Sequence, residues 1–137
     1  MDKSKILDVL INEDGKSTRL EKVKRIYEMS LDSLVEKTEA WGDEKGITQE
    51  DNFFNQWEKA EEEFWEMTEE VELIKIGHGD MNDFKGEVGD VFVCLINVLK
   101  CANTTVEECL QLAYDKISKR KGETINGTFV KESDLKK

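Results

Sequence analysis

Two pairs of acidic residues, each three positions apart, are the side chains best suited to chemistry. The first pair is Glu63 and Glu66, and the second is Glu87 and Asp90. Residues three apart lie on one face of a helix. Two helices joined by a short loop pack antiparallel, which would bring the four carboxylates into one small volume. Crowded carboxylates repel one another unless a cation lies among them, and Mg²⁺ binds oxygen ligands of this kind.

The alternative is a charged face that only contacts solvent. With 31 acidic residues among 137, two acids three apart should occur about seven times by chance. The second pair carries more information, because Glu87 and Asp90 lie next to an apolar run and adjoin Gly86 and Gly89. A glycine lets a neighbouring helix or a ligand come close. Periodicity alone leaves both the metal site and the solvated face open.

A phosphorylated ligand bound to the metal could contact three further side chains. Lys116 and Arg120 are four residues apart in the last predicted helix, where cations also simply complement the helix dipole. Lysine and arginine suit phosphate oxygens, and arginine can bind them through two hydrogen bonds. Asn97 is a polar residue in an apolar run. It could contact a base or sugar, or form a hydrogen bond in the core.

Composition excludes several classes of partner. The chain has 20 basic and 31 acidic side chains, a net charge of -11, and such a surface repels phosphate backbones. We therefore expect no nucleic-acid polymer as a partner. The longest uncharged apolar run, residues 91–99, is shorter than the ~20 residues of a membrane helix, and no signal segment precedes it. We expect no membrane partner and a cytoplasmic location.

The chain has no proline, so its helices are predicted from apolar spacing, capping residues and glycines. A short helix is expected over residues 3–11. A longer one, capped by Ser17 or Thr18, is expected to end near residues 41–42. Together they form a predicted N-terminal helical extension, residues 1–45.

The acidic pairs fall in the two helices that follow. Thr48 and Asp51 resemble a capping box at the start of the first helix, which ends at a pair of glycines. Asp80 can cap the second helix, and Thr105 can cap a last helix that includes both cations. These helices make up the predicted catalytic domain, residues 46–122.

The C-terminal residues 123–137 could form a hairpin around Asn126 and Gly127. With no partner strand apparent elsewhere, they are predicted to be an extended arm. No strand is expected, and the predicted fold class is all-α, an antiparallel helical bundle.

Three segments of the chain together resemble the MazG-like nucleoside triphosphate pyrophosphohydrolases. They are Glu62-Glu63-Phe64-Trp65-Glu66-Met67, Gly86-Glu87-Val88-Gly89-Asp90-Val91 and Lys116-x-x-x-Arg120. The family signature is E-E-x-x-E, a spacer, E-x-x-D, and a later lysine and arginine. The resemblance covers residues 52–122, and residues 121–132 look like the phage-borne, single-domain branch of the family.

The resemblance implies a fold of the all-α NTP pyrophosphatase type that assembles as a homodimer or homotetramer. It implies Mg²⁺-dependent cleavage of a nucleoside triphosphate between its α and β phosphates, giving a monophosphate and pyrophosphate. Mn²⁺ is a possible substitute for Mg²⁺.

The resemblance also implies a role for each matched residue. The implied Mg²⁺ ligands are Glu63, Glu66, Glu87 and Asp90. The candidates for orienting the attacking water are Glu62, Glu63, Glu66 and Glu69. Lys116 and Arg120 would bind phosphate. The glutamates continue as far as Glu72, so the register of the first pair is not unique. Met67 and Val71 favour Glu63 and Glu66, because they then fall where the family has apolar residues.

Two other functions stay open on the sequence. A non-catalytic helical module could bind a basic partner protein through its acidic face. A related all-α pyrophosphatase restricted to dUTP or dCTP would select its base through residues such as Asn97 and through the subunit interface.

Overall fold

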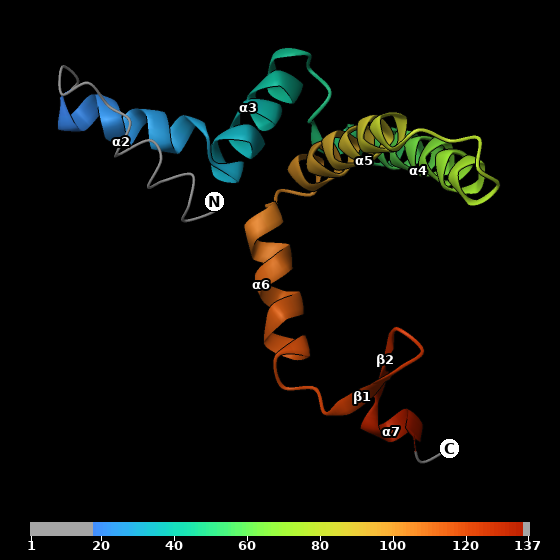
Figure 1. The fold of residues 1–137 in the computed structure, drawn as a ribbon. Helices are drawn as coiled ribbons and strands as arrows, with labels where there is room; N and C mark the ends of the chain where they lie inside the picture. The colour runs from blue at the N-terminus through green and yellow to red at the C-terminus, as the bar shows by residue number, and fades with distance from the viewer. Residues whose placement is uncertain (1–17, 136–137) are drawn as a thin grey trace. The chain divides into compact units, whose positions relative to one another are not determined.

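The computed structural model describes residues 18–135, which are mostly helical and include one small sheet (Figure 1). The helical content confirms the predicted all-α character, and the sheet corrects the expectation that the chain has no strand. The chain divides into two compact units, with the boundary between Asn103 and Thr104. This division falls inside the segment predicted as the catalytic domain. The helix expected over residues 3–11 lies outside the described residues.

The first unit begins with two helices, α2 (Arg19–Glu28) and α3 (Leu31–Glu44). Thr18 caps α2 as predicted, since its hydroxyl accepts from the Glu21 N–H while the Glu21 carboxylate accepts from the Thr18 N–H. The prediction of one continuous helix to residues 41–42 is wrong. Ser30 interrupts it, because its hydroxyl donates to the Tyr27 carbonyl and accepts from the Ser33 N–H.

A single turn of 3-10 helix, η1 (Glu50–Asn52), precedes the long helix α4 (Phe53–Lys75). The predicted Thr48–Asp51 capping box does not form, because the Thr48 hydroxyl donates to the Asp43 carboxylate instead. The Asn52 amide donates to the Ile47 carbonyl at 2.8 Å and ties the start of α4 to the preceding loop.

The next helix, α5 (Met81–Cys101), runs antiparallel beside α4, as Figure 1 shows. Asp80 caps it as predicted, accepting from the Asn82 N–H at 2.7 Å. The connection between the two helices includes Gly77, whose φ of 81° suits the residue that follows a helix end.

The packing of α4 on α5 decides where the acidic pairs lie. Ala60 of α4 is buried against Cys94 and Val98 of α5. Glu63 follows Ala60 by three residues, and Glu87 precedes Cys94 by seven, so each lies about one or two turns along the same face. Because the helices are antiparallel, both steps lead in the same direction. Glu66 follows Ala60 by six residues, so the core contact places Glu66 opposite Glu87, with Glu63 one turn closer to the contact.

The second unit consists of one helix, a hairpin and a terminal turn of helix. Its elements are α6 (Val106–Ile117), β1 (Gly122–Ile125), β2 (Thr128–Lys131) and α7 (Glu132–Leu135). Thr105 caps α6 as predicted, accepting from the Glu108 N–H at 3.1 Å. The helix ends earlier than predicted, so Arg120 follows it; the Arg120 N–H donates to the Ile117 carbonyl at 3.2 Å in a closing turn.

The predicted extended arm is wrong, because its two halves pair with each other. β1 and β2 form an antiparallel sheet with Gly122 opposite Lys131. Asn126 and Gly127 connect the strands with φ of 50° and 80°, the positive values that a tight two-residue turn requires. No single helix in residues 18–135 is both long and apolar enough to cross a membrane.

Candidate metal centre

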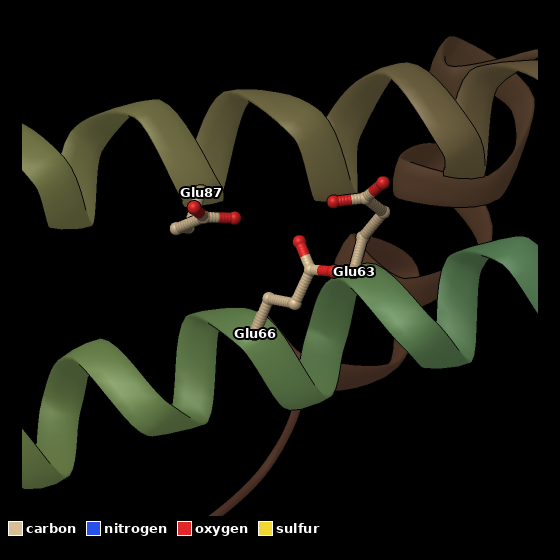
Figure 2. A group of neighbouring side chains, drawn as sticks. All are labelled: Glu63, Glu66 and Glu87. Atoms are coloured by element: carbon tan, nitrogen blue, oxygen red, sulfur yellow. The ribbon is translucent and has the colours of Figure 1, made fainter.

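Three glutamates from the two antiparallel helices converge on one point (Figure 2). Glu63 and Glu66 project from α4, and Glu87 faces them from α5. One carboxylate oxygen from each lies within 4.8 Å of the other two. Glu63 and Glu87 are half-buried, while Glu66 is exposed. The site thus opens to solvent on the side of Glu66.

The charges in this group oppose one another. The negative charge of Glu63 is the main cause that raises the pKa of Glu66 above its usual value. Loss of hydration raises the pKa of Glu87, with further contributions from the charges of Asp90 and Glu63. The ionised forms are therefore disfavoured in the absence of a compensating cation.

The donor set fits a hard divalent cation. Oε2 of Glu87 is buried and accepts no hydrogen bond, which is unusual for a buried polar atom. Carboxylate oxygens are the ligands that Mg²⁺ prefers, and Mg²⁺ commonly binds through a few of them while keeping several waters. A cation among these oxygens would give the unpaired atom a partner and relieve the repulsion. The oxygens alone do not select Mg²⁺ over Mn²⁺ or Ca²⁺.

We expect Mg²⁺ to stabilise the protein more at neutral than at acidic pH. Because the pKa values of Glu66 and Glu87 are raised in the folded state, the folded protein binds more protons than the unfolded chain above pH ~4.5. The free energy of unfolding therefore falls as pH rises from ~4.5 through the folded-state pKa values of the two glutamates. The stability lost in this range is not regained at higher pH. Mg²⁺ should offset this loss only where the carboxylates are ionised.

The measurement is thermal denaturation with and without MgCl₂ at about pH 7.5 and about pH 4.5. The rise in Tm caused by Mg²⁺ should be clear at the higher pH and nearly absent at the lower. NaCl at matched ionic strength controls for general screening of a chain with net charge -11. An equal rise at both pH values, or an equal rise with NaCl, would contradict a carboxylate site.

Asp90 is not a member of the three-glutamate group, although its charge contributes to the raised pKa of Glu87. It lines a pocket of about 270 Å³ between α3, α4 and α5. It also lines a second hollow together with Lys37 and Trp41 of α3. The residues around the first pocket are Trp41, Ile47, Gln56, Lys59, Glu63, Asp90, Val93, Cys94 and Asn97. Glu63 thus belongs both to the three-glutamate group and to the pocket wall.

Asn97 is the most deeply buried polar side chain of the pocket wall, with 2% of its surface exposed. Its Oδ1 accepts no hydrogen bond, so this atom does not form the core hydrogen bond that the sequence allowed. The oxygen lies close to Gly42 of α3, where a side chain would meet it. A buried amide oxygen without a partner suits a ligand that carries an N–H donor.

Glu62 and Glu69 are not members of the three-glutamate group. Glu62 is exposed and pairs with Lys59. Glu69 lines a groove on α4 with Trp65 and Ile76 rather than the three-glutamate group. Lys116 and Arg120 belong to the second unit.

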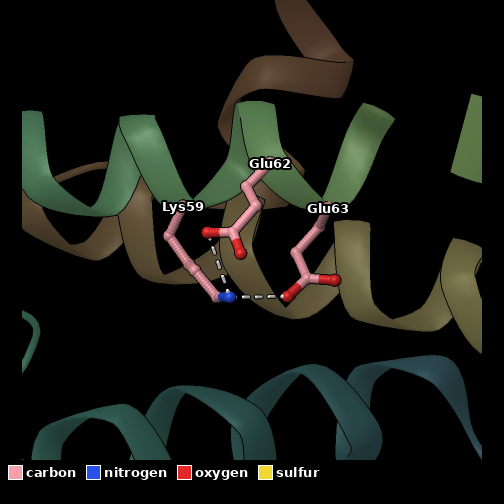
Figure 3. A network of polar contacts seen from close by, with 3 residues as sticks. All are labelled: Lys59, Glu62 and Glu63. Atoms are coloured by element: carbon pink, nitrogen blue, oxygen red, sulfur yellow. Dashed lines mark ion pairs between the residues drawn. The ribbon is translucent and has the colours of Figure 1, made fainter. Parts of the chain in front are cut away.

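Sequence reasoning missed Lys59. Its Nζ lies 3.0 Å from Oε1 of Glu63 and 3.3 Å from Oε2 of Glu62 (Figure 3). These hydrogen bonds raise the pKa of Lys59, that with Glu63 being the larger cause. The signal was present in the sequence, because Lys59 precedes Glu63 by four residues and such pairs meet on a helix.

No protein-family model, curated protein or solved structure matches this chain. The resemblance to the MazG-like enzymes therefore rests on the motifs in the sequence.

Proposed function

We propose that the chain is a Mg²⁺-dependent nucleoside triphosphate pyrophosphohydrolase of the MazG-like type. Water would attack so that the bond between the α and β phosphates breaks, giving a nucleoside monophosphate and pyrophosphate. The observation that carries the proposal is the three-glutamate group. Its members are the E-x-x-E pair and the first residue of the E-x-x-D pair.

Glu63, Glu66 and Glu87 would hold the Mg²⁺, with Asp90 beside Glu63. Bound there, Mg²⁺ would neutralise phosphate charge and make a coordinated water more acidic. A nearby carboxylate can accept the proton that the attacking water loses.

The pocket next to Glu63 would take the nucleoside. Its volume of about 270 Å³ is just below the roughly 300 Å³ at which ligand pockets usually begin. Trp41 offers an aromatic surface, and Asn97 of the pocket wall would contact the base or the sugar. Lys116 and Arg120 of the second unit are the residues proposed to bind phosphate oxygens.

The burial of Glu87 favours the enzyme over an acidic module that binds a basic protein. A lysine or arginine of a partner protein would pair most easily with exposed carboxylates. Oε2 of Glu87 is instead closed off from solvent between α4 and α5. A small cation fits that position better than a side chain does.

The test is pyrophosphate release from a panel of ribo- and deoxynucleoside triphosphates, with Mg²⁺ and with EDTA. We expect release that depends on Mg²⁺. Activity on dUTP or dCTP alone would identify the narrower pyrophosphatase. Pyrophosphate from none of the nucleotides would contradict the proposal and direct attention to basic partner proteins.

We also propose that the chain assembles as a homodimer or homotetramer. Several aromatic side chains of α4 are exposed, among them Phe54 at 76%, Trp57 at 45% and Phe64 at 54%. Burying such side chains against another copy would remove apolar surface from water. We expect sedimentation at micromolar concentration to give at least a dimer. A monomer under these conditions would contradict the assembly.

A further inference from the structure

Lys59 places a positive charge directly on one of the three glutamates. Its Nζ is 3.0 Å from Oε1 of Glu63, a short charge-assisted contact (Figure 3). The Glu63 side chain is only 12% exposed, whereas the Lys59 side chain is 46% exposed. The ammonium therefore reaches inward, from a half-exposed side chain to a carboxylate that is mostly covered.

Lys59 and a divalent cation would compete for Glu63. A carboxylate oxygen that accepts from an ammonium has lost much of its capacity to bind a metal. Two cations held within several ångströms of each other also repel, and partial burial of Glu63 weakens the screening by water.

Glu62 is a second ion-pair partner for the Lys59 ammonium. Its Oε2 already lies 3.3 Å from the Lys59 Nζ, and its side chain is 60% exposed. Lys59 can therefore leave Glu63 and still keep an ion pair at the surface. A divalent cation would replace Lys59 as the partner of Glu63, and Lys59 would keep its ion pair with Glu62. Neither charge would then be left unpaired.

We propose that Lys59 is the resident counter-ion of the three-glutamate group, and that a divalent cation must displace it from Glu63 to bind. The proposal rests on the metal centre proposed above. It assigns to Lys59 a positioning role: the residue keeps the group compact without metal and sets the affinity for the metal.

The experiment measures Mn²⁺ binding without nucleotide, by electron paramagnetic resonance of free Mn²⁺. Lys59→Met removes the charge and keeps a long side chain of similar helix propensity. We expect it to bind Mn²⁺ roughly three- to tenfold more tightly than the parent protein. Lys59→Arg keeps the charge and should bind within about twofold of the parent.

The matched control is Lys24→Met. Lys24 pairs with Glu28 on α2 at 3.9 Å, also with four-residue spacing, and its loss changes the total charge equally. Its Mn²⁺ affinity should stay within about twofold of the parent, since distant charges are screened. If both lysine variants gain affinity equally, only the net charge matters, and the proposal is overturned.

The outcomes also separate this proposal from the metal centre. If the parent binds Mn²⁺ and Lys59→Met binds no more tightly, the counter-ion role is wrong while the metal centre stands. If the parent binds no Mn²⁺, both fall together. Circular dichroism on each variant establishes that the helices are intact.

Discussion

The Glu87→Gln variant is expected to release pyrophosphate at least ~100-fold more slowly than the parent protein at saturating Mg²⁺. Glutamine has nearly the same shape but offers a neutral amide where the metal needs a charged oxygen. The same change should leave the fold intact. Burial and the charges of Asp90 and Glu63 disfavour the ionised form of Glu87, so a neutral side chain should raise Tm in EDTA or leave it unchanged.

The measurement combines steady-state pyrophosphate release with thermal denaturation in EDTA and in Mg²⁺. Glu72→Gln is the control, because Glu72 is an exposed glutamate of α4 outside the three-glutamate group. It should keep the activity of the parent. Retention of more than half of the activity by Glu87→Gln would show that Glu87 is not a metal ligand.

The opposite signs expected for activity and stability distinguish a functional carboxylate from a structural one. A glutamate retained for stability would make hydrogen bonds or ion pairs that its replacement removes. Glu87 has a buried oxygen without any hydrogen bond, close to two other carboxylates. An acid in such a place lowers stability by itself, so its presence is better explained by a ligand.

The relation between the two acidic helices could be predicted from the sequence because it depends on spacing alone. Ala60 precedes Glu63 by three residues, and Cys94 follows Glu87 by seven, so each acid shares a face with a small core residue. The Gly77 turn and the Asp80 cap fixed the point where the chain reverses. Antiparallel packing then follows from the short connection.

The position of Asp90 shows where spacing becomes insufficient. Three residues rotate a helix by about 300°, so Asp90 lies about 60° around α5 from Glu87. That rotation is small enough to suggest a shared face. With α4 and α3 both packed on α5, it turns Asp90 toward α3, where it lines a hollow with Trp41.

Local hydrogen bonds account for the other errors of prediction. Ser30 lies in a stretch with helical apolar spacing, but its hydroxyl binds the backbone on both sides and ends one helix while starting another. Residues 122–131 contain the turn signal Asn126-Gly127, and the missing partner strand is the neighbouring half of the same hairpin. In both segments a short-range contact prevailed over the longer pattern.

The Gly42→Ala variant is expected to lower the free energy of unfolding by roughly 1–3 kcal/mol, although alanine is the better helix former. Gly42 is a buried residue of α3 that faces α5. A Cβ at this position would overlap Oδ1 of Asn97 and lie 2.8 Å from Cγ2 of Thr48. Asn97 is 2% exposed, so it has little room to move away.

Gly86→Ala provides the matched control, because Gly86 is also helical and a Cβ there would meet no atom within 4 Å. It should gain up to ~1 kcal/mol, the usual difference between glycine and alanine in a helix. Urea denaturation of both variants measures the contrast. Equal gains in stability at the two positions would contradict the close approach of α3 to α5.

The cost at position 42 should depend on Asn97, and this dependence links the fold to the pocket. Shortening Asn97 to Ala removes the oxygen that a Cβ of residue 42 would overlap, so Gly42→Ala should cost less in an Asn97→Ala background. A double-mutant cycle by urea denaturation measures this coupling, and additive effects would contradict it. Because Trp41 adjoins Gly42 and lines the same pocket as Asn97, the contact that holds α3 on α5 also shapes the proposed nucleoside site. Gly42→Ala should therefore weaken nucleotide binding as well as stability, without changing the three glutamates that would hold the metal.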